Sequence, residues 1–292
     1  MRKAIKIELW KAFHNPMLWL ALAGAAFIVL ANVWDCAAEM ANWTRVVQPF
    51  MGDPDVPASI FSTEGYSLFV LSLPYYSNLF SAQVFIYVWP ILAAIPYGTS
   101  YMTDRRTGVY NQIVSRIGKK KYFIAKYLAV FVTGGLVVAL TVLAALLADA
   151  MVVPYWKVHI SLIEVIHSGT FLSTLYYTHP WLHILCWCGV LFFIGGCTAC
   201  LTFFAWTGLR LRALTAVIPF AIYFVIATVA SRLISAGFIP YSDFVQKFSN
   251  VLFMVQVQSS AYPGFWALIM AGIITVITLI AGYFQVVRHE LD

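Results

Sequence analysis

The chain has 292 residues, of which 62% are hydrophobic and only 10% are charged, and its mean hydropathy is +0.83. A soluble domain is about 45–50% apolar and about 25% charged. One globular core cannot bury this excess of apolar side chains, so the composition excludes a soluble enzyme, a disordered protein and a secreted disulfide scaffold. The net charge of +6 does not indicate nucleic-acid binding, because the basic residues lie between long apolar runs and not on one soluble face.

Six apolar runs are long enough to cross about 30 Å of hydrocarbon as helix, at about 1.5 Å per residue. A helix satisfies its own backbone hydrogen bonds inside a bilayer, and the runs lack the alternating pattern of a barrel strand. The sequence therefore predicts one all-α membrane domain over residues 1–292, with six transmembrane helices. The expected spans are residues 16–34, 84–103, 123–150, 181–206, 213–231 and 263–287.

Lys and Arg are divided unequally between the segments that join these runs. With the N-terminus inside the cell, the inner segments hold 14 of the 18 basic residues and the outer segments hold 4. Because basic residues favour the cytoplasmic side, we expect a multi-pass protein of the cell membrane with both termini in the cytoplasm. The first run is too long for the apolar part of a cleaved signal peptide.

Residues 1–15 are predicted to form a helix that lies along the inner membrane surface. Its apolar positions recur every four residues, with lysines around them, so the lysines can reach the lipid headgroups. These apolar positions are Ile5, Leu9 and Phe13. An ordinary positively charged anchor is the alternative interpretation.

Two outer segments are long enough to have structure of their own. Residues 35–83 are rich in turn-forming Gly, Pro and Asp, and we expect a long extracellular segment there. Residues 232–262 contain several Phe and Tyr residues and are predicted to form a re-entrant or extracellular hairpin before the last span.

The inner segment at residues 104–121 is the most informative, and it reads DRRTGVYNQIVSRIGKKK. At 3.6 residues per turn, Val109, Ile113 and Ile117 share one face, and polar residues take the opposite face. Gly118 ends the pattern. The sequence predicts a short amphipathic helix whose apolar stripe needs a partner, either the membrane surface or a groove on a soluble protein. A basic loop that only sets the topology is the alternative.

This arrangement resembles the membrane-spanning subunits of type-2 ABC transporters, the permeases of bacterial exporters. The stretch that carries the resemblance runs from Pro90 to Phe131 and reads PILAAIPYGTSYMTDRRTGVYNQIVSRIGKKKYFIAKYLAVF. The resemblance is sharpest over residues 90–135 and general in topology over the whole chain. The long first outer segment departs from the shortest members of the family.

The resemblance implies that the loop between spans two and three is a coupling helix, which sits in a cleft of an ATPase subunit and carries nucleotide-driven motion to the spans. It implies a permease in a bacterial plasma membrane, working with two copies of a separate ABC ATPase subunit and a second permease, identical or related. The expected substrate is a peptide, a hydrophobic compound or a lipid for export. The residues expected at the ATPase contact are Asp104, Arg105, Arg106, Gly108, Tyr110, Ile113, Arg116 and Ile117.

Three common catalytic motifs do not occur in the sequence. It contains no G-x-x-x-x-G-K-[ST] phosphate loop, no complete H-E-x-x-H and no G-x-S-x-G. We therefore expect no enzyme activity and no cofactor in this chain, with ATP and magnesium bound by the partner ATPase. With the spans placed as above, the ionisable residues lie at or beyond the ends of the spans and not in their interiors. Proton-coupled transport normally needs ionisable groups at membrane depth, so this absence disfavours it.

The fourth apolar run contains residues that could bind a metal ion. His179, His183 and Cys186 share one helical face near its outer end, and Cys197 and Cys200 lie further into the span. Such soft ligands suit copper or zinc. Interfacial His and packed Cys are the better interpretation, so we expect no metal. The small residues Gly195, Gly196, Thr198 and Ala199 of this run predict a close approach to another helix.

Two other functions remain open. One is a secondary transporter or channel that works without an ATPase. The other is a non-transporting immunity or sensor protein that binds a peptide through residues 35–83.

Overall fold

The computed structural model describes residues 1–47, 67–75, 79–155, 166, 171–203, 212–238, 251–257 and 264–284. Among these residues the chain is helical and contains no strand, which confirms the all-α class. Five of the described helices are long and apolar enough to cross a membrane, which supports a multi-pass membrane protein. They are α2 (Pro16–Val47), α7 (Lys119–Asp149), α9 (Pro180–Cys200), α10 (Arg212–Ser235) and α12 (Gly264–Tyr283).

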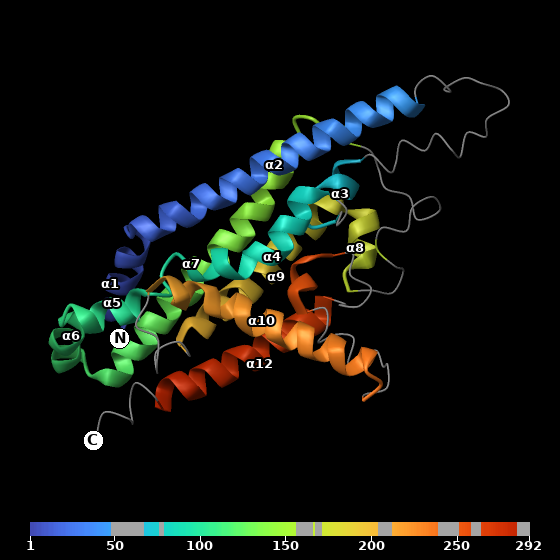
Figure 1. Cartoon of the computed structure of the whole chain (residues 1–292). Helices are drawn as coiled ribbons and strands as arrows, with labels where there is room; N and C mark the ends of the chain where they lie inside the picture. The colour runs from blue at the N-terminus through green and yellow to red at the C-terminus, as the bar shows by residue number, and fades with distance from the viewer. Residues whose placement is uncertain are drawn as a thin grey trace.

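The short helices gather at the two ends of this bundle (Figure 1). At one end lie α1 (Arg2–Phe13), α5 (Ser100–Arg106) and α6 (Val109–Ile117), and at the opposite end lie α3 (Leu68–Leu71) and α8 (Ser173–Thr178). The remaining elements are α4 (Phe80–Ala94) and the 3-10 helix η5 (Val251–Val255). The helices α7 and α9 are mostly buried, whereas α10 and α12 leave most of their apolar surface exposed.

The pair α7 and α9 makes the most extensive helix contact in the described chain. Glycines bring the two backbones together, because a Cβ on Gly134 would lie 2.3 Å from the Cβ of Ala199 and 2.6 Å from the carbonyl oxygen of Ala93. A Cβ on Gly195 would lie 2.9 Å from a methyl group of Val138. The close approach predicted for the fourth run is confirmed, with α7 as the partner.

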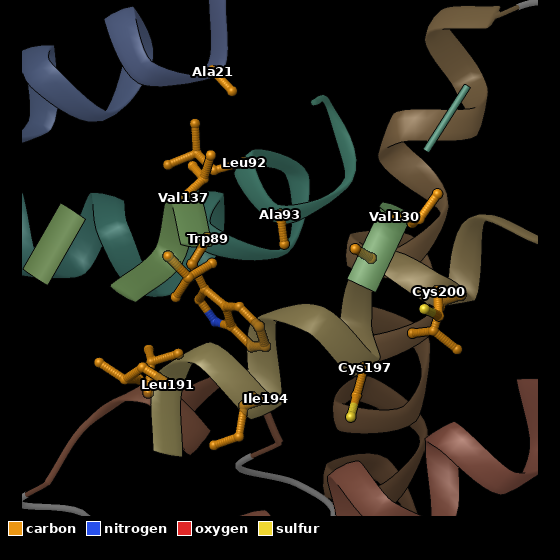
Figure 2. Close-up of a cluster of buried hydrophobic side chains, with 14 of the residues drawn as sticks. Ala21, Trp89, Leu92, Ala93, Val130, Val137, Leu191, Ile194, Cys197 and Cys200 are labelled. Atoms are coloured by element: carbon orange, nitrogen blue, oxygen red, sulfur yellow. The ribbon is translucent and has the colours of Figure 1, made fainter. Parts of the chain in front are cut away.

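Trp89 of α4 lies at the centre of the core that this packing creates. Its ring lies near Leu191 and Ile194 of α9 (Figure 2), and it is fully buried. Its indole Nε1 donates a hydrogen bond to the carbonyl oxygen of Leu252 at 3.0 Å, which joins the core to η5. A buried indole N–H needs such a partner, because leaving it unpaired is costly.

The structure differs from the single helix expected over residues 84–103. Here α4 ends at Ala94, a tight turn follows, and α5 begins at Ser100. Pro96 cannot extend the hydrogen-bonded ladder of α4. Gly98 is required in the turn, because a Cβ there would lie 2.5 Å from the carbonyl oxygen of Ala94. With 15 residues, α4 is about 22 Å long and shorter than the hydrocarbon layer. The sixth span therefore remains a prediction.

The outer segments are described only in part. The helix α2 continues through residues 35–47, beyond the expected end of the first span, and residues 48–66 and 76–78 lie outside the described residues. Of the hairpin expected at residues 232–262, residues 232–238 and 251–257 are described, including the end of α10 and η5, and the others lie outside the described residues. The last expected span is helical as far as Tyr283.

Candidate functional site

A buried cation lies at the end of the bundle where α1, α5 and α7 meet. The ammonium group of Lys126 on α7 donates to Asp104 Oδ2 at 2.6 Å and to Glu8 Oε2 at 3.0 Å. The side chain of Lys126 has no exposed surface, and Glu8 is 3% exposed. The phenol oxygen of Tyr97 accepts a third hydrogen bond from Lys126 at 3.3 Å. A charge this deeply buried is tolerated only when its donors and partners are satisfied.

Two tyrosines also donate hydrogen bonds to the carboxylates. The Tyr97 hydroxyl donates to Glu8 Oε2 at 2.8 Å, and the Tyr122 hydroxyl donates to Asp104 Oδ2 at 2.7 Å. Lys11 on α1 donates to the other oxygen of Glu8 at 3.2 Å. These contacts tie α1, the α4–α5 turn, α5 and α7 together. We refer to Glu8, Tyr97, Asp104, Tyr122 and Lys126 as the Lys126 cluster.

The sequence did not predict this cluster. Lys126 is the fourth residue of the expected span at residues 123–150 and lies at its inner end, where nothing in the sequence indicated that its side chain would be buried in the protein. Asp149 at the other end of α7 is also buried, and Asn32 donates to its Oδ2 at 2.6 Å. Lys126 and Asp149 lie about 34 Å apart along the helix, so they flank a hydrocarbon layer of about 30 Å.

The predicted amphipathic helix of the inner segment is confirmed as α6, a helix of 9 residues. It begins after Gly108 and ends before Gly118, which have φ of +74° and +81°. Ile113, Val114 and Ile117 are half-buried against the core, and the polar residues on the other side are exposed. The chain itself covers part of the apolar stripe, and an outside partner for the rest stays a prediction.

Three tyrosine rings connect α6 to its neighbours. Tyr110 of α6 packs against Tyr101 of α5 at 5.8 Å and against Tyr122 of α7 at 5.3 Å, measured between ring centroids. Because the Tyr122 hydroxyl binds Asp104, the rings link α6 to the Lys126 cluster. A displacement of α6 therefore acts on α5 and α7 through packed and hydrogen-bonded groups.

The eight residues expected at the ATPase contact divide into two sets. Asp104 and Tyr110 point into the protein, and Ile113 and Ile117 are half-buried against it. The exposed set consists of Arg105, Arg106, Gly108 and Arg116. The guanidinium of Arg105 also lies 5.3 Å from the ring centroid of Tyr110. The first set is packed wholly or partly against the rest of the fold, and the second set lies on the surface.

The N-terminal segment is helical as expected, but its buried face is different. The residues of α1 that are buried are Ala4, Glu8 and Ala12. The expected apolar positions are half-buried or exposed, with Phe13 exposed. Small alanines let α1 approach α7 closely, and the pairing with Lys126 allows Glu8 to be buried between them. This helix is therefore packed against the bundle, and its position along the inner membrane surface stays a prediction.

The residues considered as metal ligands do not come together in the structure. His183 Nδ1 shares a hydrogen bond with the Tyr75 hydroxyl at 2.8 Å, whereas His179 and Cys186 are exposed. In the part of the chain that the structure describes, no group of three or more His, Cys, Asp or Glu residues is placed to hold a metal ion.

The two glycines that bound α6 differ in what they tolerate, which gives a first prediction. Gly118 has φ +81° and ψ 150°, a region that is almost exclusive to glycine, whereas Gly108 has left-handed helical angles that Asn also adopts. We expect Gly118→Ala to lower the free energy of unfolding by about 1–3 kcal/mol and Gly108→Asn to lower it by less. Chemical unfolding of both variants in mixed micelles measures the difference. Equal effects would contradict the assigned backbone geometry.

Comparisons with known proteins assign this chain to no family. No protein-family model matches it, and no curated protein or solved structure shows a significant match. The fold and the site define an all-α, multi-pass membrane protein with an exposed amphipathic helix tied to a buried charge cluster at one end.

Proposed function

We propose that the chain is the permease subunit of an ATP-driven ABC transporter that exports a peptide, a hydrophobic compound or a lipid. The single observation that carries the proposal is the arrangement of α6. This helix presents a polar face outward between two glycine turns, while its other face and its tyrosine are fixed to α5 and α7. A partner that moved the polar face would move α5 and the membrane helix α7 with it.

The Lys126 cluster would carry motion of α6 further into the bundle. Motion of α6 reaches Asp104 through Tyr110 and Tyr122, and Lys126 joins Asp104 to Glu8 on α1. The helix α7 is then locked to α9 by the glycine contacts. The chain holds no phosphate loop, so a separate ATPase subunit, in two copies with ATP and magnesium, supplies the work.

The proposal places α6 and both termini in the cytoplasm, in agreement with the distribution of basic residues. A second permease, identical or related, would pack beside this chain, and the exposed apolar faces of α10 and α12 suit such a partner or lipid. Large exposed apolar surfaces favour burial against a protein or a membrane.

Purification of the tagged, full-length chain from bacterial membranes in a mild detergent tests the proposal. A soluble phosphate-loop ATPase is expected to co-purify in a two-to-two ratio with the permease, and the reconstituted complex is expected to move substrate only with ATP. Transport that persists without any ATPase would instead support a secondary transporter or channel. A chain that recruits no ATPase and moves nothing would overturn the proposal.

The exposed basic residue Arg116 of α6 gives a second prediction. Reversal of its charge with Arg116→Glu is expected to reduce ATPase co-purification and ATP-driven transport at least tenfold, because the change alters only the polar face of α6. The matched control is Arg45→Glu, since Arg45 is equally exposed at the far end of α2. Charge reversal at Arg105 and Arg106 should act in the same direction. Equal activity of the Arg116 and Arg45 variants would count against coupling through α6.

A further inference from the structure

A hollow of about 700 Å³ lies next to the Lys126 cluster, between the α1–α2 junction, the α4–α5 turn and the start of α10. Its volume falls in the range of about 300–1,000 Å³ that is typical of small-molecule sites. Its wall is apolar along α2 and α4 and polar along α5. This contrast indicates a ligand with one polar end and one apolar end.

The polar end of the hollow is formed by one face of α5. Ser100, Thr103 and Asp104 stand at positions i, i+3 and i+4, so their side chains share a face, and all three line the hollow. The Ser100 hydroxyl is unusual, because the residue is only 7% exposed and its oxygen has no hydrogen-bond partner among the described residues. Such an oxygen is costly to bury unless a partner arrives.

Asp104 offers a second acceptor oxygen. Its Oδ2 accepts hydrogen bonds from Tyr122 and Lys126, whereas its Oδ1 accepts none from the residues that the structure describes. Among the described side chains that line the hollow, Asp104 is the only charged one. The free oxygen of this carboxylate suits a cationic group with N–H donors better than a phosphate or sulfate, which would be repelled by it.

The apolar wall leads away from this end. Met17 and Leu20 of α2, Ile91 of α4 and Val217 of α10 line it, and Met17, Leu20 and Val217 are exposed on the outer surface of the bundle. The hollow can therefore be entered from the side of the bundle, where a membrane protein meets lipid. The tail of a bound molecule would follow this wall toward the hydrocarbon.

We propose that this hollow binds an amphiphile with a primary ammonium head and an apolar tail. The ammonium N–H groups would donate to Asp104 Oδ1 and Ser100 Oγ, and the tail would lie against Met17, Leu20 and Ile91. Three N–H donors suit this set of acceptors better than a quaternary ammonium, which has none. The site uses this chain alone, so it does not depend on the proposed ATPase.

Dodecylammonium added to the purified full-length chain in phosphatidylcholine nanodiscs tests the site, with dodecyl sulfate as the probe of equal tail and opposite charge. Dodecylammonium is expected to raise the unfolding temperature and to appear as a bound mass in native mass spectrometry, and dodecyl sulfate is not. Ser100→Ala is expected to weaken dodecylammonium binding about 2- to 10-fold, because one hydrogen bond is lost.

A matched pair on α10 keeps the test independent of the charge cluster. Val217→Trp would fill the hollow and is expected to abolish binding, whereas Leu214→Trp changes a similarly exposed residue outside the hollow and should bind normally. Equal binding of the two probes, or unchanged binding in Val217→Trp, would overturn the proposal.

Two sources could supply the ammonium head, a lipid or a free hydrophobic amine. Native mass spectrometry of the chain as isolated separates them. A phosphatidylethanolamine adduct that is lost in Val217→Trp identifies the lipid. Binding of dodecylammonium without such an adduct identifies a free amphiphile. Either result supports the site, and neither requires transport activity, so failure of the proposed function would be seen separately.

Discussion

Substitution of Lys126 by Met is expected to lower the free energy of unfolding by about 3–5 kcal/mol, the range for removing one partner of a buried ion pair. The methionine fills much of the space but leaves two carboxylates without their shared cation. Asp104 would keep only the Tyr122 hydroxyl as a donor, and Glu8 would keep Tyr97 and Lys11. Chemical unfolding in mixed micelles and the yield of inserted chain measure the loss.

The control for this prediction lies on the same helix. Lys121 is exposed in the first turns of α7, so Lys121→Met should change stability by less than about 1 kcal/mol. Removal of the two carboxylates together with the cation should recover part of the loss, in the variant Lys126→Met, Glu8→Gln, Asp104→Asn. If Lys126→Met were as stable as Lys121→Met, the cluster would have no structural role.

The helix α6 could be predicted from the sequence because every signal for it is local. The apolar residues recur at helical spacing within nine residues, and a glycine stands at each end. Local periodicity and turn residues are the signals that a single sequence reports best. What covers the apolar stripe could not be predicted, since the covering residues come from other helices.

The Lys126 cluster could not be predicted because its members are far apart in the chain. Glu8 and Lys126 are separated by 118 positions, and each alone is typical of a helix end near a membrane surface. The periodicity of α1 also pointed to a different face, because Ala4 and Ala12 carry little hydrophobic signal. Their small size, which allows close packing on α7, is a tertiary effect.

The break between α4 and α5 is marked in the sequence by a proline and a glycine. Pro96 and Gly98 stand inside an otherwise apolar run, and hydropathy alone does not distinguish such a run from one helix. The turn they form places Tyr97 against Glu8 and directs α5 so that Asp104 meets Lys126. The feature that shortens the expected second span is thus the one that assembles the site.

Substitution of Gly134 by Val is expected to destabilise the bundle by about 3 kcal/mol or more, at the upper end of the cost of overpacking. A Cβ there would lie 2.3 Å from the Cβ of Ala199 and 2.6 Å from the backbone oxygen of Ala93. Neither neighbour is the end of a flexible side chain, so α7 would have to move away from both α9 and α4. Unfolding in mixed micelles and the yield of inserted chain measure the effect.

Gly189→Val provides the matched control. Gly189 lies on α9 as well, but a Cβ there meets nothing within 4 Å, so the same substitution should be close to neutral. The double variant Gly134→Ala, Ala199→Gly should be more stable than Gly134→Ala alone, because it removes one of the two clashes and leaves the one with Ala93. If Gly134→Val and Gly189→Val behaved alike, α7 and α9 would not be in backbone contact, and motion of α6 would have no rigid route from α7 into the core.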